Sequence, residues 1–379
     1  MAADRLEVAF LTPAYHPQTG GAETYTRHAL AALARRGHRV TVVSGTTGAT
    51  GVDVVDGVTV HRVGPPRIGG LAGSARWLPR WSRACWRVLD DVAPSVLFAH
   101  YTGIHAAARW ARRNPTPVVA LVHDVYGFVE NVRWRGPVGG TVRYLNNDRL
   151  LVRARPDVVV AVSEATAAAA RVRTRAPISV ARPGCDHVPP GPDPDPSSRR
   201  VLFVGRLVRS KGLDDALASV AAARASVPDA TLVVVGSGPT ELALPPWVTR
   251  LGAIDDDELD REFRSSAALV LPSQREGWGL VVTEAAARGL PYVAYDIPAL
   301  REQHVLVGGG VLTPPGDVDA LARSVRALLT DSQLRRRLGA RGHDSARRYL
   351  TWRQTAEVVE SALFAARDRS AGSRSVDAA

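Results

Sequence analysis

The chain has 379 residues, of which 45% are hydrophobic and 22% charged, and it carries a formal net charge of +11. This composition indicates a soluble globular protein long enough for two domains, and no apolar run reaches the roughly 18 residues that cross a bilayer. The two cysteines, Cys85 and Cys185, exclude a disulfide framework and lack metal-ligand spacing, so we expect reduced thiols in a cytoplasmic protein.

The excess charge lies on one half of the chain. Residues 1–190 contain 24 arginines and 13 acidic residues, whereas residues 191–379 contain 24 basic and 24 acidic residues. This asymmetry favours an anionic partner for the N-terminal half: a phosphorylated acceptor, a membrane surface or nucleic acid. Because no zinc finger, RNA-binding signature or base-reading helix accompanies it, we expect no nucleic-acid partner.

The N-terminal half alternates strands and helices. An apolar strand at 6–13 precedes a helix at 22–38, and alanine-rich helical stretches separate the later strands. Those later strands are predicted at 39–45, 58–63, 95–100, 117–124 and 157–163. Continuous apolar strands that alternate with helices predict a parallel sheet covered on both faces.

The same alternation restarts after a proline-rich linker. Strands are predicted at 201–205, 230–236, 268–272 and 291–296. We therefore predict an α/β protein with two Rossmann-like domains. The expected segments are an N-terminal domain at 1–188, a linker at 189–200, a C-terminal domain at 201–350, a helix at 351–366 and a disordered tail at 367–379.

Three loops after strands could carry chemistry, because ligands of open α/β sheets bind beyond the carboxyl ends of the strands. In HPQTGGAETY, Gly20 and Gly21 allow close backbone approach at a helix N-terminus, which favours an anion, although such turns are also common without a ligand. In VLFVGRLVRSKG, Arg206 and Lys211 follow a strand, and Lys211 is the only lysine of the chain. A diphosphate suits this pair of cations, and the alternative is a solvated basic loop.

The third loop, PSQREGWGLVVTEAAARG, carries two carboxylates. Glu276 precedes a Gly-Trp-Gly turn, and Glu284 follows on the next helix. Carboxylates beside a phosphate site suit sugar hydroxyls, whereas either one could simply be a helix-start carboxylate. The backbone around Gly279 and Leu280 opens that helix and offers a further anion site.

Together these loops resemble the retaining family 4 of the GT-B glycosyltransferases. The matching pieces are YHPQTGGAE, the GH of RRGHRVTVVS, HD in VALVHDVYGF, VSEAT, VGRLVRSKG and EGWGLVVTEA, and they extend over nearly the whole chain. EGWGLVVTE fits the family's E-x7-E pattern from Glu276 to Glu284.

The resemblance implies a role for each matching residue. The C-terminal domain would hold a nucleotide-sugar donor, whose diphosphate contacts Arg206, Lys211, the Gly20–Gly21 loop and the backbone of Gly277, Trp278, Gly279 and Leu280. Glu284 would bind the ribose and Glu276 the transferred sugar. The backbone of Gly252–Ile254, which includes Gly252 and Ile254, would face the base.

The resemblance also implies a chemistry. His123 would contact the sugar near the reaction centre, although a histidine that ends an apolar strand is more often structural. Lys211 would neutralise the leaving diphosphate, so no metal and no other cofactor is expected. The implied reaction retains the anomeric configuration by front-face displacement, with a UDP-sugar as the first candidate donor and a GDP-sugar as the second. Double displacement through a protein nucleophile stays open.

The acceptor side is less defined. Residues 76–89, RWLPRWSRACWRVL, combine arginines with tryptophans, a mixture that suits the headgroup region of a bilayer. This segment favours peripheral contact at the inner membrane face and a lipid-linked acceptor. The apolar face could equally be core, with solvated arginines. Arg133, Arg135 and Arg143 extend the positive field, and a saccharide or natural-product acceptor stays open.

Two other functions compete with glycosyl transfer. A nucleotide-sugar epimerase would bind the same donor, but it would not need an acceptor domain with its own charge. A non-catalytic scaffold that binds nucleotide or membrane would not need Arg206, Lys211, Glu276 and Glu284 together. Product analysis with the donor alone and with an added acceptor would separate the three functions.

Overall fold

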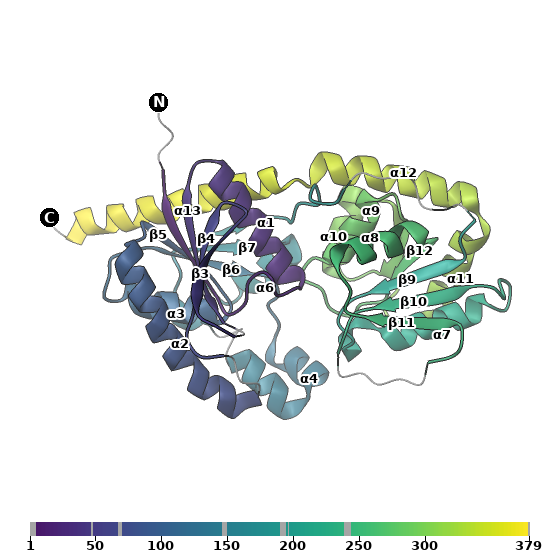
Figure 1. The fold of residues 1–379 in the computed structure, drawn as a ribbon, viewed down its shortest axis with the longest axis horizontal. Coiled ribbons are helices and arrows are strands. Elements are labelled where there is room, and N and C mark those ends of the chain that lie inside the picture. The colour runs from purple at the N-terminus through teal and green to yellow at the C-terminus, as the bar shows by residue number, and fades with distance from the viewer. Residues whose placement is uncertain are drawn as a thin grey trace. The chain divides into compact units, whose positions relative to one another are not determined.

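The structure, a computed structural model, divides the chain into two compact units (Figure 1). It describes residues 5–46, 48–66, 70–145, 150–189, 195, 197–238 and 244–377. The N-terminal unit comprises residues 1–184 and 352–379, and the C-terminal unit comprises residues 185–351. Half of the expected linker, 190–194 and 196, lies outside the described residues.

The N-terminal unit is built on one sheet. Every neighbouring pair of strands is parallel except β3 and β4, which form a hairpin around Asp56 and Gly57. In spatial order the strands are β3 (Gly51–Val55), β4 (Val58–Val63), β2 (Arg39–Gly45), β1 (Glu7–Thr12), β5 (Val96–His100), β6 (Val118–Val122), β7 (Val158–Ala161) and β8 (Ile178–Val180). The central strands are buried along their whole length, which explains their continuous apolar sequences.

Helices cover both faces of this sheet. The helices are α1 (Gly21–Arg35), α2 (Gly70–Val92), α3 (Thr102–Ala111), α4 (Phe128–Arg143), α5 (Leu150–Ala154), α6 (Glu164–Arg171) and α13 (Trp352–Asp377). The C-terminal helix α13 lies against α1 and strands β5 to β8, so the end of the chain belongs to the N-terminal unit. Thr355 Oγ1 of α13 donates to the carbonyl oxygen of Arg182 at 2.6 Å.

The C-terminal unit repeats the design with an all-parallel sheet. Its strands, in spatial order, are β11 (Val248–Gly252), β10 (Thr231–Val235), β9 (Arg200–Val204), β12 (Ala268–Leu271), β13 (Tyr292–Tyr295) and β14 (Gly310–Thr313). Its helices are η2 (Arg209–Lys211), α7 (Leu213–Ala223), α8 (Asp256–Ser265), α9 (Leu280–Ala287), α10 (Pro298–Val307), α11 (Val318–Thr330) and α12 (Ser332–Tyr349). The two parallel sheets with flanking helices agree with the predicted α/β class.

The structure differs from the sequence predictions in three places. Helix α13 continues to Asp377, so the disorder predicted from residue 367 is replaced by helix. A helix that is already nucleated and packed propagates easily through alanine, arginine and serine. Short strands β3, β8, β11 and β14 were missed because three to five residues give little periodicity. The units divide after Gly184, whereas the sequence placed the end of the first domain at 188.

Helix α2 carries the tryptophan and arginine segment. Trp77 and Trp81 stack on each other at 4.9 Å between ring centroids and are buried in the core of the unit, together with Cys85 and Leu89. The interpretation of these rings as headgroup anchors is therefore wrong, because the spacing of three to four residues turns them toward the sheet. No helix in the described part of the chain is long and apolar enough to span a bilayer.

Candidate functional site

The first group of candidate residues lies at the carboxyl edge of the C-terminal sheet. Strand β9 pairs with β10 on one side and with β12 on the other, so the loops after β9 and β12 leave the sheet in opposite directions. Such a topological switch point is where open α/β sheets bind their ligands. The loop after β9 carries Arg206 and Lys211, and the loop after β12 carries Glu276.

A glycine brings these two loops into contact. Gly212, which follows η2, has φ of +72°, and a Cβ added there would lie 2.2 Å from the carbonyl oxygen of Pro272. The amide of Gln274 also donates to the carbonyl oxygen of Ser210 at 2.9 Å. Only a residue without a side chain permits this approach in this backbone conformation.

Lys211 and Glu276 form an ion pair across the two loops. The Nζ–Oε1 distance is 2.5 Å, and the side chains are only 18% and 9% exposed. The sequence assigned these residues to different parts of one ligand, and the structure places the two charges side by side. Arg206 lies on the same loop as Lys211, five residues earlier in the sequence, and is exposed. This edge of the sheet therefore carries a second cation.

The Gly-Trp-Gly turn leads directly into α9. Gly279 is its N-cap with φ of +96° and supplies no side-chain cap, so the first turn beginning at Leu280 offers backbone N–H groups. Gln303 Nε2 holds the turn by donating to the carbonyl oxygens of Trp278 and Gly279 at 3.4 and 3.2 Å. Gly277 is the first residue of this turn. An uncapped N-terminus held in a fixed conformation suits an anionic ligand.

Glu284 lies on α9 beyond the turn. Its Oε1 is 3.6 Å from Nε2 of His187, a residue that the sequence analysis did not single out. Gly252 ends β11 with φ of +75° and accepts a hydrogen bond from the amide of Gly236 at 2.6 Å. Ile254 packs in part against the core. These residues belong to the same unit as the Lys211–Glu276 pair.

A second group lies at the carboxyl edge of the N-terminal sheet. Gly20 caps α1 without a side chain, and the helix begins at Gly21. A Cβ added at Gly20 would lie 2.4 Å from Oε2 of Glu23, so the carboxylate of the first turn folds over this position. The helix N-terminus has no side-chain cap hydrogen bond, but a carboxylate lies over it, so the anion site predicted for the Gly-Gly turn stays a prediction.

His123 follows β6 at this edge and is held by aromatic rings. Its ring makes edge contacts with Tyr25 at 5.0 Å and with His100 at 4.6 Å between centroids. Its Nε2 atom is buried without a hydrogen-bond partner among the described residues, although part of the residue remains exposed. Burial lowers the pKa of His123 to about 4, against the opposing effect of Asp124, so the ring is neutral at pH 7.

The surroundings of His123 add residues that the sequence did not reveal. His100 ends β5, and Tyr101 beside it has φ of +49°; burial is the main cause that holds the pKa of His100 well below its usual value. Asp124 pairs with Arg143 at 2.6 Å, and that guanidinium lies 5.6 Å from the centroid of the Tyr101 ring. A histidine at the end of a second parallel strand was the available signal for His100.

The other two arginines predicted on the acceptor side are Arg133 and Arg135. Arg133 lies on α4 with its guanidinium 5.6 Å from the ring centroid of Trp134. The side chain of Arg135 lies outside the described residues. Of the three arginines singled out from the sequence, Arg143 is the one that the structure brings to His123.

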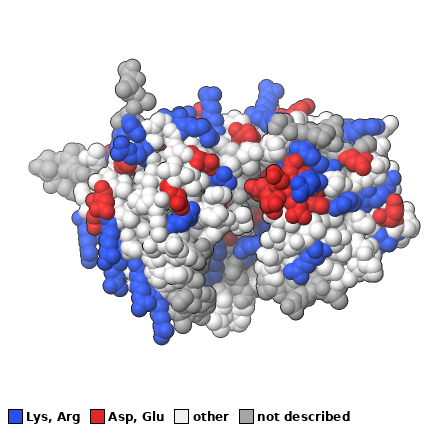
Figure 2. All heavy atoms as spheres, in the orientation of Figure 1, with Lys and Arg blue, Asp and Glu red and all other residues white. Residues whose placement is uncertain are grey.

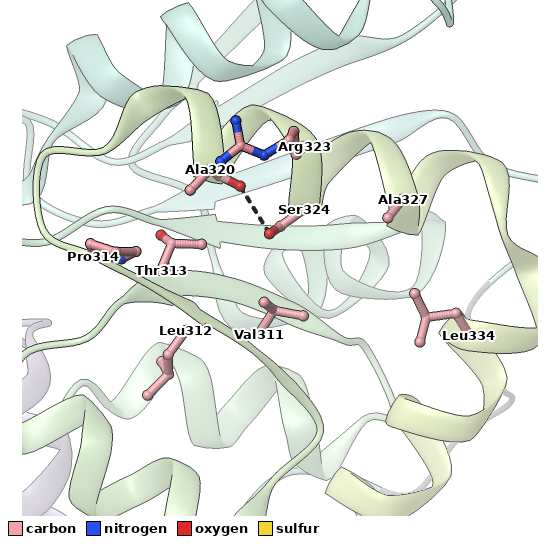
Figure 3. Close-up of a pocket in the computed structure, with 9 residues that line it drawn as sticks. All are labelled: Val311, Leu312, Thr313, Pro314, Ala320, Arg323, Ser324, Ala327 and Leu334. Carbon is pink, nitrogen blue, oxygen red and sulfur yellow. Dashed lines mark hydrogen bonds between the residues drawn. The ribbon is translucent and has the colours of Figure 1, made fainter.

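Within the described residues, no group of three or more His, Cys, Asp or Glu side chains is arranged to hold a metal ion. A cavity of about 350 Å³ lies between β14, α11 and α12, where Ser324 donates to the carbonyl oxygen of Ala320 (Figure 3). It is lined mainly by apolar side chains and by none of the predicted site residues, so it is a poor match to a donor diphosphate.

Two protein-family models match the chain. "Glycosyltransferase Family 4" matches residues 19–188, and "Glycosyl transferases group 1" matches residues 191–345. The chain belongs to the family 4 glycosyltransferases of the GT-B fold. The first match ends four residues beyond the boundary between the two units and the second begins at 191, so each match lies mainly in one unit of this glycosyltransferase family member.

Individual relatives and structures agree with this assignment. The chain is 32% identical over 176 residues to glycogen synthase of Mycobacterium tuberculosis, a match that covers 44% of this chain and 42% of that protein. It is 27% identical over 387 residues to D-inositol 3-phosphate glycosyltransferase of Segniliparus rotundus, covering 92% and 85%. The alignments to the first curated relatives thus span less than half of their length.

Solved structures share the fold. Sucrose-phosphate synthase from Thermosynechococcus elongatus superposes with a TM-score of 0.80 at 21% identity, covering 93% of this chain and 97% of that one. Anabaena HepE in complex with UDP-glucose superposes with a TM-score of 0.70 at 17% identity, covering 93% and 98%.

Proposed function

We propose that the protein is a retaining, metal-independent glycosyltransferase. It moves a sugar from a nucleotide-diphosphate donor to a hydroxyl group of a saccharide, lipid-linked or natural-product acceptor. A UDP-sugar is the first candidate donor and a GDP-sugar the second. The observation that carries the proposal is the Lys211–Glu276 pair at the switch point of the C-terminal sheet, next to an uncapped helix N-terminus.

The C-terminal unit has the parts that a nucleotide-sugar needs. Arg206 and Lys211 supply positive charge for the diphosphate, and the N–H groups at the start of α9 supply hydrogen-bond donors. Glu276 and Glu284 supply acceptors for sugar and ribose hydroxyls. The structure of HepE, whose fold this chain shares, is titled as a complex with UDP-glucose, which supports UDP as the first base to test.

In the proposed reaction, the chain's own residues would stabilise the charge changes without a metal ion. In the proposed front-face displacement, the acceptor oxygen forms a bond to the anomeric carbon while the bond from that carbon to the diphosphate oxygen breaks. The acceptor proton passes to the leaving diphosphate oxygen. Lys211 and Arg206 would stabilise the negative charge that develops there, a role that a metal ion fills in other transferases.

His123 is suited to position the sugar without carrying charge. Because burial holds its pKa at about 4, the ring at pH 7 is neutral, with one nitrogen that donates and one that accepts a hydrogen bond. Its Nε2 is the buried atom without a partner in the described chain. A sugar hydroxyl would satisfy it, and a neutral ring would not oppose positive charge at the anomeric carbon.

Thermal unfolding with UDP, GDP, ADP and dTDP, each with and without EDTA, tests the donor site. A nucleotide at about 100 times its dissociation constant should stabilise the folded protein by about 2.7 kcal/mol. One nucleotide that raises the melting temperature equally in EDTA supports a metal-free site and identifies the base. Lack of stabilisation by all four would contradict the proposal.

Product analysis then tests the reaction itself. The matching nucleotide-sugar, incubated in EDTA with candidate acceptors, should yield a glycoside with the donor's anomeric configuration, as read by NMR. An inverted product would contradict the proposed stereochemistry. A sugar-nucleotide isomer formed without acceptor would favour an epimerase.

A further inference from the structure

One exposed face of the N-terminal unit is lined by arginines. Along α2, four of them are spaced four, three and four residues apart, so they share one side of the helix: Arg76, Arg80, Arg83 and Arg87. All four are exposed, and the row extends about 16 Å along the helix axis at 1.5 Å per residue. Figure 2 shows a row of blue side chains over the part of the surface where Figure 1 draws α2, with no red between them.

The end of α3 extends this arginine face. Trp86 Nε1 donates to the carbonyl oxygen of Ala106 at 3.0 Å, and Trp110 Nε1 donates to Asp90 at 2.9 Å, so the two helices are tied together. Three more exposed arginines stand at the end of α3: Arg109, Arg112 and Arg113. With Arg83 and Trp86 they line a pocket of about 340 Å³ that has no acidic side chain in its wall.

These seven arginines have no acidic partners, which separates them from others on the same unit. Arg27, Arg36 and Arg62 each pair with a carboxylate, at 2.7, 2.5 and 2.8 Å. Within the described chain, no carboxylate oxygen lies within 4.0 Å of any arginine of the arginine face. Like charges at this spacing destabilise a helix modestly, so an outside anion would relieve the repulsion along the row.

We propose that this arginine face docks the N-terminal unit onto an anionic lipid membrane. A straight row of exposed cations matches a planar array of headgroup phosphates, and the pocket beside it can take one phosphate at a guanidinium fork. Trp77 and Trp81 of α2 are buried, so the contact is electrostatic adsorption and not insertion. Trp86, which lines the pocket, is half-buried under Arg113 and offers no open stacking surface for the bases of a nucleic acid.

The contact is independent of the proposed reaction, because binding can be measured without donor or acceptor. Full-length protein is sedimented with vesicles of phosphatidylcholine alone or with 30% phosphatidylglycerol. We expect binding only to the anionic vesicles at 0.1 M salt and its loss at 1 M salt, where the screening length falls from about 10 to about 3 Å.

Charge variants locate the contact. Each arginine near an anionic surface contributes about a fivefold factor to binding, so replacing the four arginines of α2 by glutamine should weaken binding at least about 100-fold. The same four positions changed to lysine should keep binding within about fivefold. The matched control removes four exposed, acid-free arginines of the C-terminal unit and should also stay within fivefold: Arg323→Gln, Arg326→Gln, Arg336→Gln and Arg337→Gln.

Three results would overturn the proposal. The first is an equal loss in the α2 and control variants, which would mean that net charge alone drives adsorption. The second is unchanged vesicle binding in the α2 glutamine variant with a wild-type melting temperature. The third is tighter binding to a 20-base-pair DNA duplex than to vesicles at the same salt through the same arginines, which would make nucleic acid the partner.

Discussion

The Lys211–Glu276 pair lets one substitution separate a structural role from a catalytic one. Lys211→Met keeps most of the side-chain volume and removes the charge. The two charged atoms are 2.5 Å apart, and the side chains are 18% and 9% exposed. An exposed ion pair contributes at most about 1 kcal/mol, whereas breaking a buried pair costs about 3–5 kcal/mol. The burial of this pair is intermediate between these two cases. We therefore expect the free energy of unfolding to fall by about 2 kcal/mol, or the melting temperature by about 4–8 °C.

The effect on the reaction should be larger than the effect on stability. Loss of one preorganised charge at the site of developing negative charge costs about 100- to 1,000-fold in rate. The measurement is kcat/KM for sugar transfer at a temperature where each variant is fully folded. Arg209→Met is the matched control, because Arg209 is an exposed cation of the same short helix with no carboxylate within 4.0 Å in the described chain.

The double variant completes the test. Adding Glu276→Gln to Lys211→Met removes the unpaired carboxylate, so most of the lost stability should return. The activity should not return, because the cation is still missing. Lys211→Met with kcat/KM within threefold of the wild type, or a double variant that regains both stability and activity, would refute the catalytic argument.

Three further outcomes can be checked by denaturation. The pKa of His123 is about 4 in the folded protein and about 6.5 in the unfolded chain, so the unfolded state binds more protons between these values. The contribution of His123 to the free energy of unfolding should therefore fall by about 3 kcal/mol from pH 6.5 to 4, and a His123→Gln variant that keeps the full slope would contradict this. Gly212→Ala should cost at least about 2 kcal/mol in urea, because its Cβ meets backbone at 2.2 Å, whereas Gly252→Ala, with a similar φ but open space, should cost only about 1 kcal/mol. Trp352→Ala removes a buried ring and should cost about 3–5 kcal/mol, whereas Arg353→Ala, 82% exposed, should change stability by less than about 0.5 kcal/mol; similar losses would show that α13 is not anchored by its buried face.

The sequence was sufficient for the class of fold and for the loops of the site. Continuous apolar strands alternating with helices predicted parallel sheets, and the C-terminal sheet has that form throughout, whereas the N-terminal sheet departs from it only at the β3–β4 hairpin. The lone lysine, the Gly-Gly turn and the Glu276–Glu284 spacing marked loops that lie at the carboxyl ends of strands. These features are local in sequence, so periodicity and turn chemistry reveal them.

The sequence left undecided whether the tryptophans of α2 face a membrane or the protein core. Its tryptophans and arginines were compatible with a bilayer interface or with a core, because both environments favour the same amphipathic spacing. The structure turns Trp77 and Trp81 into the core and leaves the arginines outside. The pocket at the end of α3 also depends on two helices that are distant in sequence, which no single segment could reveal.

What the sequence determined by itself is the alternation of strands and helices, the loops that carry charge and the excess of arginine in the first half. What only the tertiary structure decided is which side chains meet: Lys211 with Glu276, His123 with His100, and Asp124 with Arg143. The first two contacts join segments at the ends of different strands, and the third joins the end of β6 to helix α4. Their distances depend on the strand order and on close backbone approaches such as Gly212 on Pro272, which the packed sheet alone fixes.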